Sequence, residues 1–366
     1  MTTTATDLDA LRRQLQDWLS VQVGAPVTVG EVTRPGQAGM SNVSLIFDAS
    51  WMQDGAECRA DLVARMAPDA DAVPVFPAYD LALQYEVIAA VAATSKVPVP
   101  QLRWIEHSPA ALGSPVIVMD RVEGRVPVDN PPYVFGGWYF DAALADQLAL
   151  QSATLELIAQ LHAIPEVAAT FPVLASGVGP DPLRSHFDRQ REYYEWTRHG
   201  DGLHIPVIED AFGWLSDNWP SDPGPAVLSW GDSRIGNVIY QGFEPVAVLD
   251  WEMASLAPRE VDVAWFIFIH RFFQDIAEMF EQRGLPEVCR RSDVVATYER
   301  ASGHELRDLD FYLVYASLRH AVVMSQVKRR MIHFGEDPEP GSPDEYVLHH
   351  ASLREMINGT YDWADR

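Results

Sequence analysis

The chain has 366 residues, and 48% of them are hydrophobic, so it can bury a sizeable core in one large or two moderate domains. Its 52 acidic residues against 27 basic ones give a formal net charge of −25. This charge argues against nucleic acid as a partner, because a phosphate-binding surface needs clustered Lys and Arg. We interpret the acidity mainly as a solubility feature, with attraction of a cationic ligand as the alternative.

No apolar run reaches the roughly 18 residues that a membrane span needs, and the amino terminus lacks a basic segment followed by an apolar one. The two cysteines, Cys58 and Cys289, cannot build a disulfide scaffold, and no Cys/His cluster has zinc-site spacing. We therefore expect a cytoplasmic protein with no membrane partner. The sequence does not indicate an oligomeric state.

The first third of the chain is rich in predicted strands. A helical pattern over residues 7–23 precedes a loop that contains Gly36 and Gly39, and residues 43–47 and 59–65 are typical of strands. A Gly-rich turn between strands can lie over phosphate groups, because side chains do not cover its backbone amides. Most such turns, however, are only hairpins.

Helical spacing returns at residues 80–93, and predicted strands at 102–105 and 115–119 end the strand-rich part. Long helical patterns dominate the remainder, which predicts two parts, residues 1–120 and 121–366. His162 falls on the apolar stripe of the first long helix of the second part. Its position there favours a buried core histidine over a catalytic one.

Three short apolar runs at residues 226–230, 238–240 and 246–249 indicate a strand, a loop, a second strand, a hairpin and a third strand. Asp232 and Asn237 lie in the loop, and a second acid, Asp250, ends the third run. This arrangement supplies oxygen ligands for a hard divalent cation and a further carboxylate that can accept a proton. Phosphoryl transfer requires such a set.

The segments WGDSRIGN and VLDWE, followed by Pro258, Asp262 and Trp265, resemble the aminoglycoside phosphotransferase family of small-molecule kinases. Within the family, they are most similar to the branch that also occurs fused to acyl-CoA dehydrogenases. The resemblance extends over residues 28–330. It implies a protein-kinase-like two-lobe α+β fold, with a small antiparallel-sheet lobe that binds nucleotide and a larger helical lobe that carries the catalytic loop and the acceptor site.

By this resemblance, Asp232 is the catalytic base or the carboxylate that orients the acceptor hydroxyl, Asn237 and Asp250 are the Mg²⁺ ligands, and Asp262 braces the loop. Trp230 is a departure, because the family has His at this position.

The resemblance also assigns residues that bind ATP. Ser41 and Asn42 match the Gly-rich loop of the family, and Arg65 stands where the family has a phosphate-binding Lys. Backbone groups near Met119 and Val122 match the hinge that holds adenine.

A Glu of the family usually pairs with the strand cation. An ungapped match places Gln84 at that position and Glu86 two residues later. These two positions face different sides of a helix. Either the register differs or the pair is absent.

The expected function is an ATP- and Mg²⁺-dependent kinase that transfers the γ-phosphoryl group to a hydroxyl of a small molecule. The branch favours a hydroxyacyl-CoA or related compound, and an amino alcohol, a sugar and an aminoglycoside remain open. The alternative is a degenerate kinase-like module that binds nucleotide or acyl-CoA without turnover, as the departures at Trp230, Arg65 and Gln84 would allow. A metal-dependent hydrolase is a poorer interpretation, because no H-E-x-x-H pattern or dense ligand cluster accompanies the acids.

Overall fold

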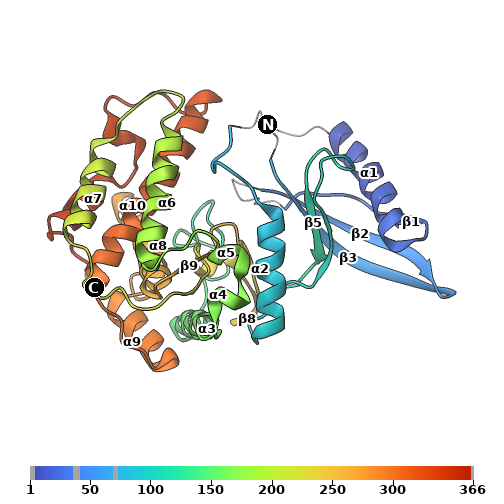
Figure 1. The fold of residues 1–366 in the computed structure, drawn as a ribbon, viewed down its shortest axis with the longest axis horizontal. Coiled ribbons are helices and arrows are strands. Elements are labelled where there is room, and N and C mark those ends of the chain that lie inside the picture. Colours follow the sequence, from blue (N-terminus) through green and yellow to red (C-terminus); the bar gives the residue numbers. More distant parts are fainter. Residues whose placement is uncertain (1–4, 36–41, 69–72, 364–366) are drawn as a thin grey trace. The chain divides into compact units, whose positions relative to one another are not determined.

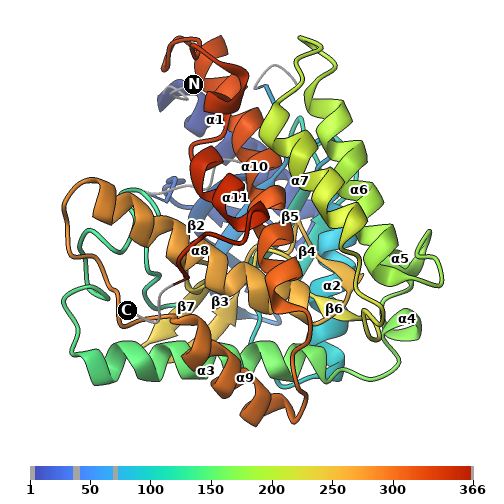
Figure 2. The same ribbon diagram turned by 90° about the vertical axis from the view of Figure 1, so that its left-hand side faces the viewer.

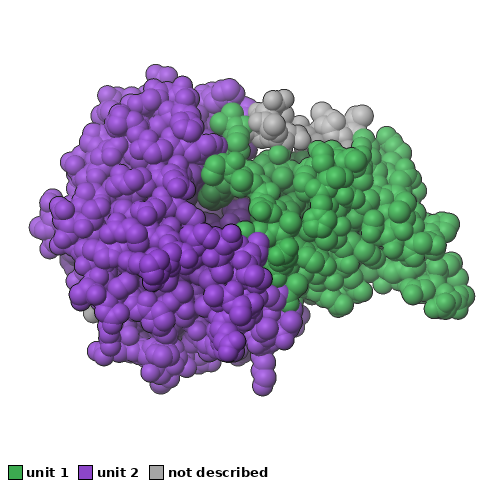
Figure 3. All heavy atoms as spheres, viewed as in Figure 1, with its two compact units in different colours: residues 1–89, 99–123 green, residues 90–98, 124–366 purple. Residues whose placement is uncertain are grey.

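The computed structural model describes residues 5–35, 42–68 and 73–363. The chain divides into two compact units, which Figure 3 distinguishes by colour. Unit 1 comprises residues 1–89 and 99–123, and unit 2 comprises residues 90–98 and 124–366. The sequence placed a single boundary at residue 120. The segment 90–98, however, groups with unit 2.

Unit 1 is built, within its described residues, on a five-stranded antiparallel sheet in the order β1-β2-β3-β5-β4 (Figure 1). The hairpin between β2 and β3 turns over Asp54 and Gly55, whose φ angles are 51° and 79°. Positive φ at both residues is typical of a two-residue hairpin turn. The strands are β1 (Val27–Val29), β2 (Val43–Gln53), β3 (Ala56–Met66), β4 (Leu102–Glu106) and β5 (Val116–Asp120).

The sheet of unit 1 buries apolar side chains on both of its faces. Alternate residues of a strand point to opposite faces, and Val118 belongs to the core that includes side chains of α1 (Ala5–Val23). Its neighbour Ile117 belongs to a second core, which includes the first residue of α2 (Leu81–Thr94). The helix predicted after the second long strand is therefore a packing partner of the sheet.

Unit 2 is mainly helical, and α8 and α10 pack against each other at its centre (Figure 2). Both helices carry long runs of buried residues, because they are covered on several sides. The helices are α3 (Leu144–His162), α4 (Val167–Thr170), α5 (Pro172–Ala175), α6 (Pro182–Thr197), α7 (Pro206–Asp217), α8 (Glu260–Met279), α9 (Arg291–Ser302), α10 (Leu309–His333) and α11 (His350–Ile357). In the described part of the chain, no helix combines the length and apolarity needed to cross a membrane.

The described residues of unit 2 also form four short strands. β7 (Val238–Gln241) and β8 (Glu244–Val248) form the predicted hairpin, whose turn contains Gly242. The strand predicted before the polar loop is β6 (Val227–Ser229), and it pairs with β9 (Ser255–Ala257), a strand that the sequence did not indicate. The small antiparallel unit and the larger helical unit confirm the predicted α+β class.

Candidate active site

The loop that joins β6 to β7 brings Asp232 and Asn237 together. We call residues 230–237 the Asp232 loop. The Asn237 Nδ2 group donates to Asp232 Oδ2 at 2.6 Å and to the Asp232 carbonyl oxygen at 3.1 Å. A 3₁₀ turn, Ile235–Asn237, allows this contact because it reverses the chain within a few residues. The sequence spacing of the acid and the amide therefore corresponds to a direct hydrogen bond.

Asp250 follows a residue that is fixed by the Asp232 loop. The Leu249 N–H donates to the Asn237 carbonyl oxygen at 2.8 Å, and the Trp230 indole N–H donates to the Leu249 carbonyl oxygen at 2.8 Å. Asp250 itself has a φ of 58°, in the left-handed region that non-glycine residues seldom adopt. Such a conformation persists only where the surrounding structure determines it, and it is frequent at functional sites.

Asp262, near the start of α8, accepts hydrogen bonds from three residues of the β6 end and the Asp232 loop, and its side chain is completely buried. Its Oδ1 accepts from Ser229 Oγ at 2.7 Å and from the Gly231 N–H at 3.0 Å. Its Oδ2 accepts from the Trp230 N–H at 2.8 Å and from His162 Nε2 at 3.0 Å. Burial by itself raises the pKa of the Asp262 carboxyl, but the hydrogen bonds from His162, Ser229 and Gly231 outweigh it and lower the pKa.

His162 is buried, as its place on an apolar helix stripe predicted. The sequence did not indicate its second role, which is to hold Asp262. Its other ring nitrogen, Nδ1, lies 2.7 Å from the Tyr298 hydroxyl, so both nitrogens are engaged. This orients the ring toward the carboxylate. His162 is thus a structural residue of the site.

Trp230 is fully buried and packs against Trp251, with 6.2 Å between the two ring centroids. Its indole supplies the hydrogen bond to Leu249 described above, so this departure from the family pattern leaves the loop tied to the end of β8. The next residue, Gly231, has a φ of 92°, and a Cβ there would lie 2.2 Å from the Met253 carbonyl oxygen. Only glycine fits this position.

The Asp232 carboxylate is paired with a part-buried cation, Arg234, that the sequence did not single out. Arg234 Nε lies 2.9 Å from both carboxylate oxygens, and Arg234 Nη1 contacts Asp129. Trp265 Nε1 donates to Asp232 Oδ1 at 2.8 Å. Burial by itself lowers the pKa of Arg234, but the carboxylates of Asp232 and Asp129 raise it far more. The pairing fixes the orientation of the Asp232 carboxylate.

The residues predicted to bind nucleotide fall in unit 1. Asn42 is buried just before β2, and Arg65 is half-buried on β3, opposite Ser44 and Ile117 in the strand register. Ser41 lies outside the described residues. Arg65 is therefore on the strand where the resemblance places the phosphate-binding cation.

The predicted hinge residues lie at and beyond the end of β5. The Met119 side chain is buried in the core shared with α2, which leaves the prediction to its backbone groups. The Arg121 N–H donates to the Asp61 carbonyl oxygen at 2.9 Å, which extends the sheet by one residue. Val122 is half-buried beyond this bond. Of the two predicted hinge residues, Val122 is thus the one outside the sheet.

The expected ion-pair partner of the strand cation is absent from its position. Gln84 is 3% exposed on α2, whereas Glu86 lies on an exposed part of the helix. The ungapped match therefore places a buried amide, in place of an acid, at this position. The structure gives no support for Glu86 as the partner of Arg65.

Asn237 and Asp250 could hold a magnesium ion. Their amide and carboxylate oxygens are the hard ligands that Mg²⁺ prefers. Within the described ranges, no group of three or more His, Cys, Asp or Glu side chains could hold a metal ion. Mg²⁺ does not require such a group, because it is commonly held by one or two protein groups together with substrate phosphates and water. The donor set therefore fits this metal.

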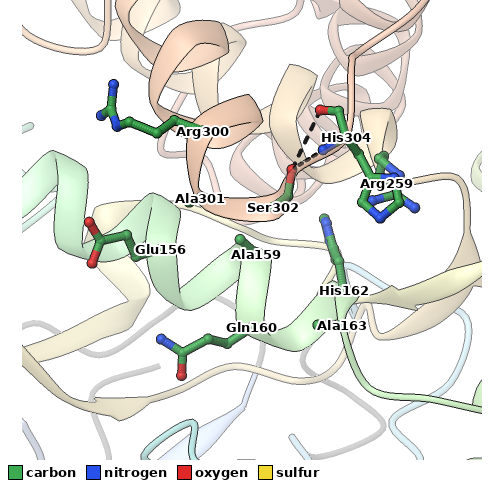
Figure 4. A pocket seen from close by; sticks show the side chains of 10 residues that line it. All are labelled: Glu156, Ala159, Gln160, His162, Ala163, Arg259, Arg300, Ala301, Ser302 and His304. Carbon is green, nitrogen blue, oxygen red and sulfur yellow. Dashed lines mark hydrogen bonds between the residues drawn. The ribbon is translucent and has the colours of Figure 1, made fainter.

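A pocket of about 450 Å³ lies elsewhere in unit 2, between α3 and the end of α9 (Figure 4). It includes His162 but none of the residues Asp232, Asn237 and Asp250. Figure 4 shows Glu156 and Arg300 at the end away from His162. Ligand pockets are usually lined mainly by apolar and aromatic side chains, whereas seven of the ten residues that line this one are polar or charged and the other three are alanines. The Asp232 loop is therefore the candidate site.

A helical unit carrying this loop, together with a small antiparallel-sheet unit, defines a protein-kinase-like phosphotransferase. A solved protein of Ralstonia eutropha, provisionally named an aminoglycoside phosphotransferase, is 19% identical with a TM-score of 0.65, over 97% of this chain and 99% of that one. A thermostable mutant of aminoglycoside phosphotransferase APH(4)-Ia, in a ternary complex with ADP and hygromycin B, is 15% identical with a TM-score of 0.53, over 96% and 99%. These likenesses confirm the predicted kinase-like fold.

The chain belongs to the phosphotransferase enzyme family, whose model matches residues 45–304. It is 25% identical over 269 residues to the probable acyl-CoA dehydrogenase IBR3 of Arabidopsis thaliana, which is 68% of this chain and 31% of that protein. The chain thus spans less than a third of the length of the curated relatives it matches. The family resemblance and its branch, inferred from WGDSRIGN and VLDWE, are confirmed.

Proposed function

We propose that this phosphotransferase transfers the γ-phosphoryl group of ATP to a hydroxyl group of a small molecule, with Mg²⁺ as cofactor. The observation that carries the proposal is the set of contacts around Asp232. Asn237, Arg234 and Trp265 hold its carboxylate, and the same loop fixes the residue before Asp250. A carboxylate and two groups suited to a divalent cation therefore occur on one hydrogen-bonded framework. Catalysis of phosphoryl transfer is mostly positioning and charge stabilisation, which such a framework supplies.

Each residue of the framework has a defined task in this proposal. Asp232 orients the acceptor hydroxyl and accepts its proton, while Arg234 and Trp265 keep the carboxylate in place. Asn237 and Asp250 would hold Mg²⁺, which, when bound, neutralises charge on the β- and γ-phosphates. Asp262 holds the loop backbone, so these side chains need little rearrangement.

Unit 1 supplies the nucleotide contacts in this proposal. Arg65 contacts phosphate oxygens, and Ser41 and Asn42 of the Gly-rich segment remain predicted phosphate contacts. Backbone groups near Met119 and Val122 hold adenine, with Val122 the better placed of the two because it lies beyond β5. The complex of the solved relative with ADP supports a nucleotide donor.

The acceptor is proposed to be a hydroxyacyl-CoA or a related hydroxy compound. The match to a probable acyl-CoA dehydrogenase supports this class, whereas an aminoglycoside is supported only at the level of fold. A kinase assay across both classes, with an amino alcohol and a sugar added, distinguishes them. We expect turnover with the hydroxyacyl-CoA.

The alternative function is a module that binds nucleotide without turnover. The substitutions at Trp230, Arg65 and Gln84 favour it. The framework around Asp232 argues against it, because a module that only binds nucleotide does not require an acid, an amide and a cation held together by hydrogen bonds in one loop.

Thermal unfolding with ATP and Mg²⁺ tests nucleotide binding, and γ-phosphoryl transfer from labelled ATP tests turnover. Nucleotide at about 100 times its dissociation constant adds roughly 2.7 kcal/mol to the free energy of unfolding. We expect a metal-dependent rise in the melting temperature of the wild type that Asp250→Ala abolishes. Asp232→Asn should retain the rise but lose turnover by about 10²- to 10⁴-fold. A shift without turnover on any acceptor would favour the binding module, and unchanged transfer in Asp250→Ala would refute the metal assignment.

A further inference from the structure

Arg319, in the middle of α10, is a buried cation whose interactions converge on the Asp232 loop. Its side chain is 1% exposed, and its Nη2 donates to the Gly231 carbonyl oxygen at 2.9 Å. Its Nε and Nη1 groups are buried and have no hydrogen-bond acceptor within the described chain. A buried guanidinium with two such donors is costly, because each lost its bond to water on folding. Other interactions must therefore offset this cost.

Three compensating interactions are present. The first is the hydrogen bond to Gly231, the residue next to Asp232. The second is the stacking of the Arg319 guanidinium over the Trp265 ring, at 4.5 Å from its centroid. The third is attraction to the carboxylates of Asp232 and Asp262. An apolar side chain would fill the same space between helices at lower cost, so packing alone does not explain the arginine.

These contacts form a closed circuit of four residues. Arg319 holds the Gly231 carbonyl, and Gly231 is covalently linked to Asp232. Arg319 also lies against Trp265, whose indole donates to Asp232 Oδ1 at 2.8 Å. The circuit thus fixes Asp232 from its backbone side and from its carboxylate side, through residues of α8, α10 and the loop.

The charges around this circuit come from several elements. Asp232 faces Arg234 of its own loop, and Arg234 contacts Asp129. The groups that interact electrostatically with Arg319 are Tyr315 of α10, His186 of α6, Asp262 and Asp232. Arg234 contacts the Asp232 carboxylate directly, whereas Arg319 acts on it through Gly231, through Trp265 and by electrostatic attraction.

We infer that Arg319 is a positioning residue for phosphoryl transfer, which holds the Gly231 carbonyl and the Trp265 indole that together orient the Asp232 carboxylate. The inference rests on the proposed role of Asp232. It assigns to α10 a task in the chemistry that its position, 88 residues from Gly231 in the sequence, does not suggest.

The test has one readout that does not depend on activity. The indole N–H resonance of Trp265, identified among the 11 tryptophans by its loss in Trp265→Phe, reports the hydrogen bond to Asp232. In Arg319→Met we expect this resonance to move upfield and to exchange faster with solvent. Arg271→Met is the matched control, because Arg271 is a part-buried arginine of α8 that pairs with Asp275. It should leave the Trp265 resonance unchanged.

The second readout is steady-state kinetics. Arg319→Met should lower kcat roughly 100-fold while the KM for ATP stays within about twofold, since a small misplacement of a reacting group affects the chemical step. Arg319→Lys keeps the charge but not the planar donors, so it should restore kcat only in part. A purely structural role would lower the melting temperature of both variants and leave kcat of the folded protein unchanged.

The outcomes separate this inference from the proposed function. An unmoved Trp265 resonance in folded Arg319→Met overturns the inference, whatever the activity. If Arg319→Met does not fold, Arg319→Lys provides the test. A Trp265 resonance and a kcat in Arg319→Lys that both match the wild type would also overturn the inference. If the wild type transfers no phosphoryl group to any acceptor, the proposed function fails, while the resonance still reports whether Arg319 positions the indole.

Discussion

The Trp230 indole donates to the Leu249 carbonyl oxygen at 2.8 Å, and this bond is one of two that join the loop carrying Asp232 to the residue before Asp250. In the family pattern a His stands at the position of Trp230. The larger indole is fully buried against Trp251 and spans the space between the two segments. The Trp230 indole therefore keeps the loop fixed at the position where the family has an imidazole.

Removing the Trp230 hydrogen bond should lower both the stability of the protein and its kcat. Trp230→Phe keeps an aromatic ring but removes the N–H donor, which leaves the Leu249 carbonyl without its partner. We expect a loss of about 1–3 kcal/mol in the free energy of unfolding, measured in urea, with a lower kcat. Trp251→Phe is the control, because its indole bonds only within its own turn, to Val248. Equal kcat in the two variants would contradict the assigned role of Trp230.

Gly231→Ala should be far more harmful than the same change at another glycine with positive φ. At Gly231 the new Cβ would lie 2.2 Å from a backbone oxygen, whereas at Gly202, with a φ of 66°, nothing lies within 4 Å. Gly202→Ala should therefore cost only the conformational strain, about 1–2 kcal/mol. Gly231→Ala should cost more than this and abolish detectable turnover. Similar melting temperatures for the two variants would show that the loop can shift.

Arg65 can be tested against a second arginine of the same strand. Arg65→Met should raise the KM for ATP by about tenfold, the equivalent of roughly 1.4 kcal/mol, if it contacts phosphate. Arg59, whose side chain is 77% exposed and pairs with Glu57, provides the control. Arg59→Met should leave the KM unchanged. An unaltered KM in Arg65→Met would remove Arg65 from the nucleotide site.

Acid should destabilise the protein partly through His349. Burial lowers the pKa of this ring from 6.5 to about 4, against the opposing hydrogen bond to the Ser317 carbonyl oxygen. In the unfolded chain His349 takes up a proton near pH 6.5, whereas the folded protein resists protonation until about pH 4. The contribution of the neutral, buried His349 to the free energy of unfolding is therefore complete above pH 6.5 and is lost as the pH falls toward 4. The full loss is on the order of 3 kcal/mol.

His349→Gln removes this titration, so its free energy of unfolding should fall less than that of the wild type between about pH 7 and about pH 5. The His320 ring centroid lies 4.9 Å from that of His349, and burial also lowers the pKa of His320, which both proteins retain. His304→Gln is the control, because His304 is exposed. The same acid-induced loss in His349→Gln and the wild type would contradict the prediction.

Local patterns in the sequence predicted the parts of the site that lie within one loop or hairpin. Asp232 and Asn237 are five residues apart and are hydrogen-bonded, and the apolar run before Asp250 forms β8. The long, strongly periodic helices were also predictable. The pairing of β6 with β9 was not, because strands of three residues carry too little pattern and depend on tertiary contacts.

The residues that surround Asp232 were less predictable. Asp129 lies 105 residues from Arg234, and Arg319 lies 88 residues from Gly231. No local period relates such positions, and a polar residue on a buried helix stripe is indistinguishable from a surface one until the partner is known. Arg234 had a usable signal, since a cation two residues after an acid in a tight loop can reach it.

The hydrogen bonds that Asp262 accepts from Trp230 and Gly231 have a further consequence. A single buried carboxylate holds the backbone of the Asp232 loop through Trp230 and Gly231, so the geometry of the reacting groups is set when the chain folds. Arrival of the acceptor then need not shape the loop. Under the proposed function, residues outside this framework can change to accommodate a different acceptor while the loop keeps its form, so that the evolution of specificity is uncoupled from that of the reaction itself.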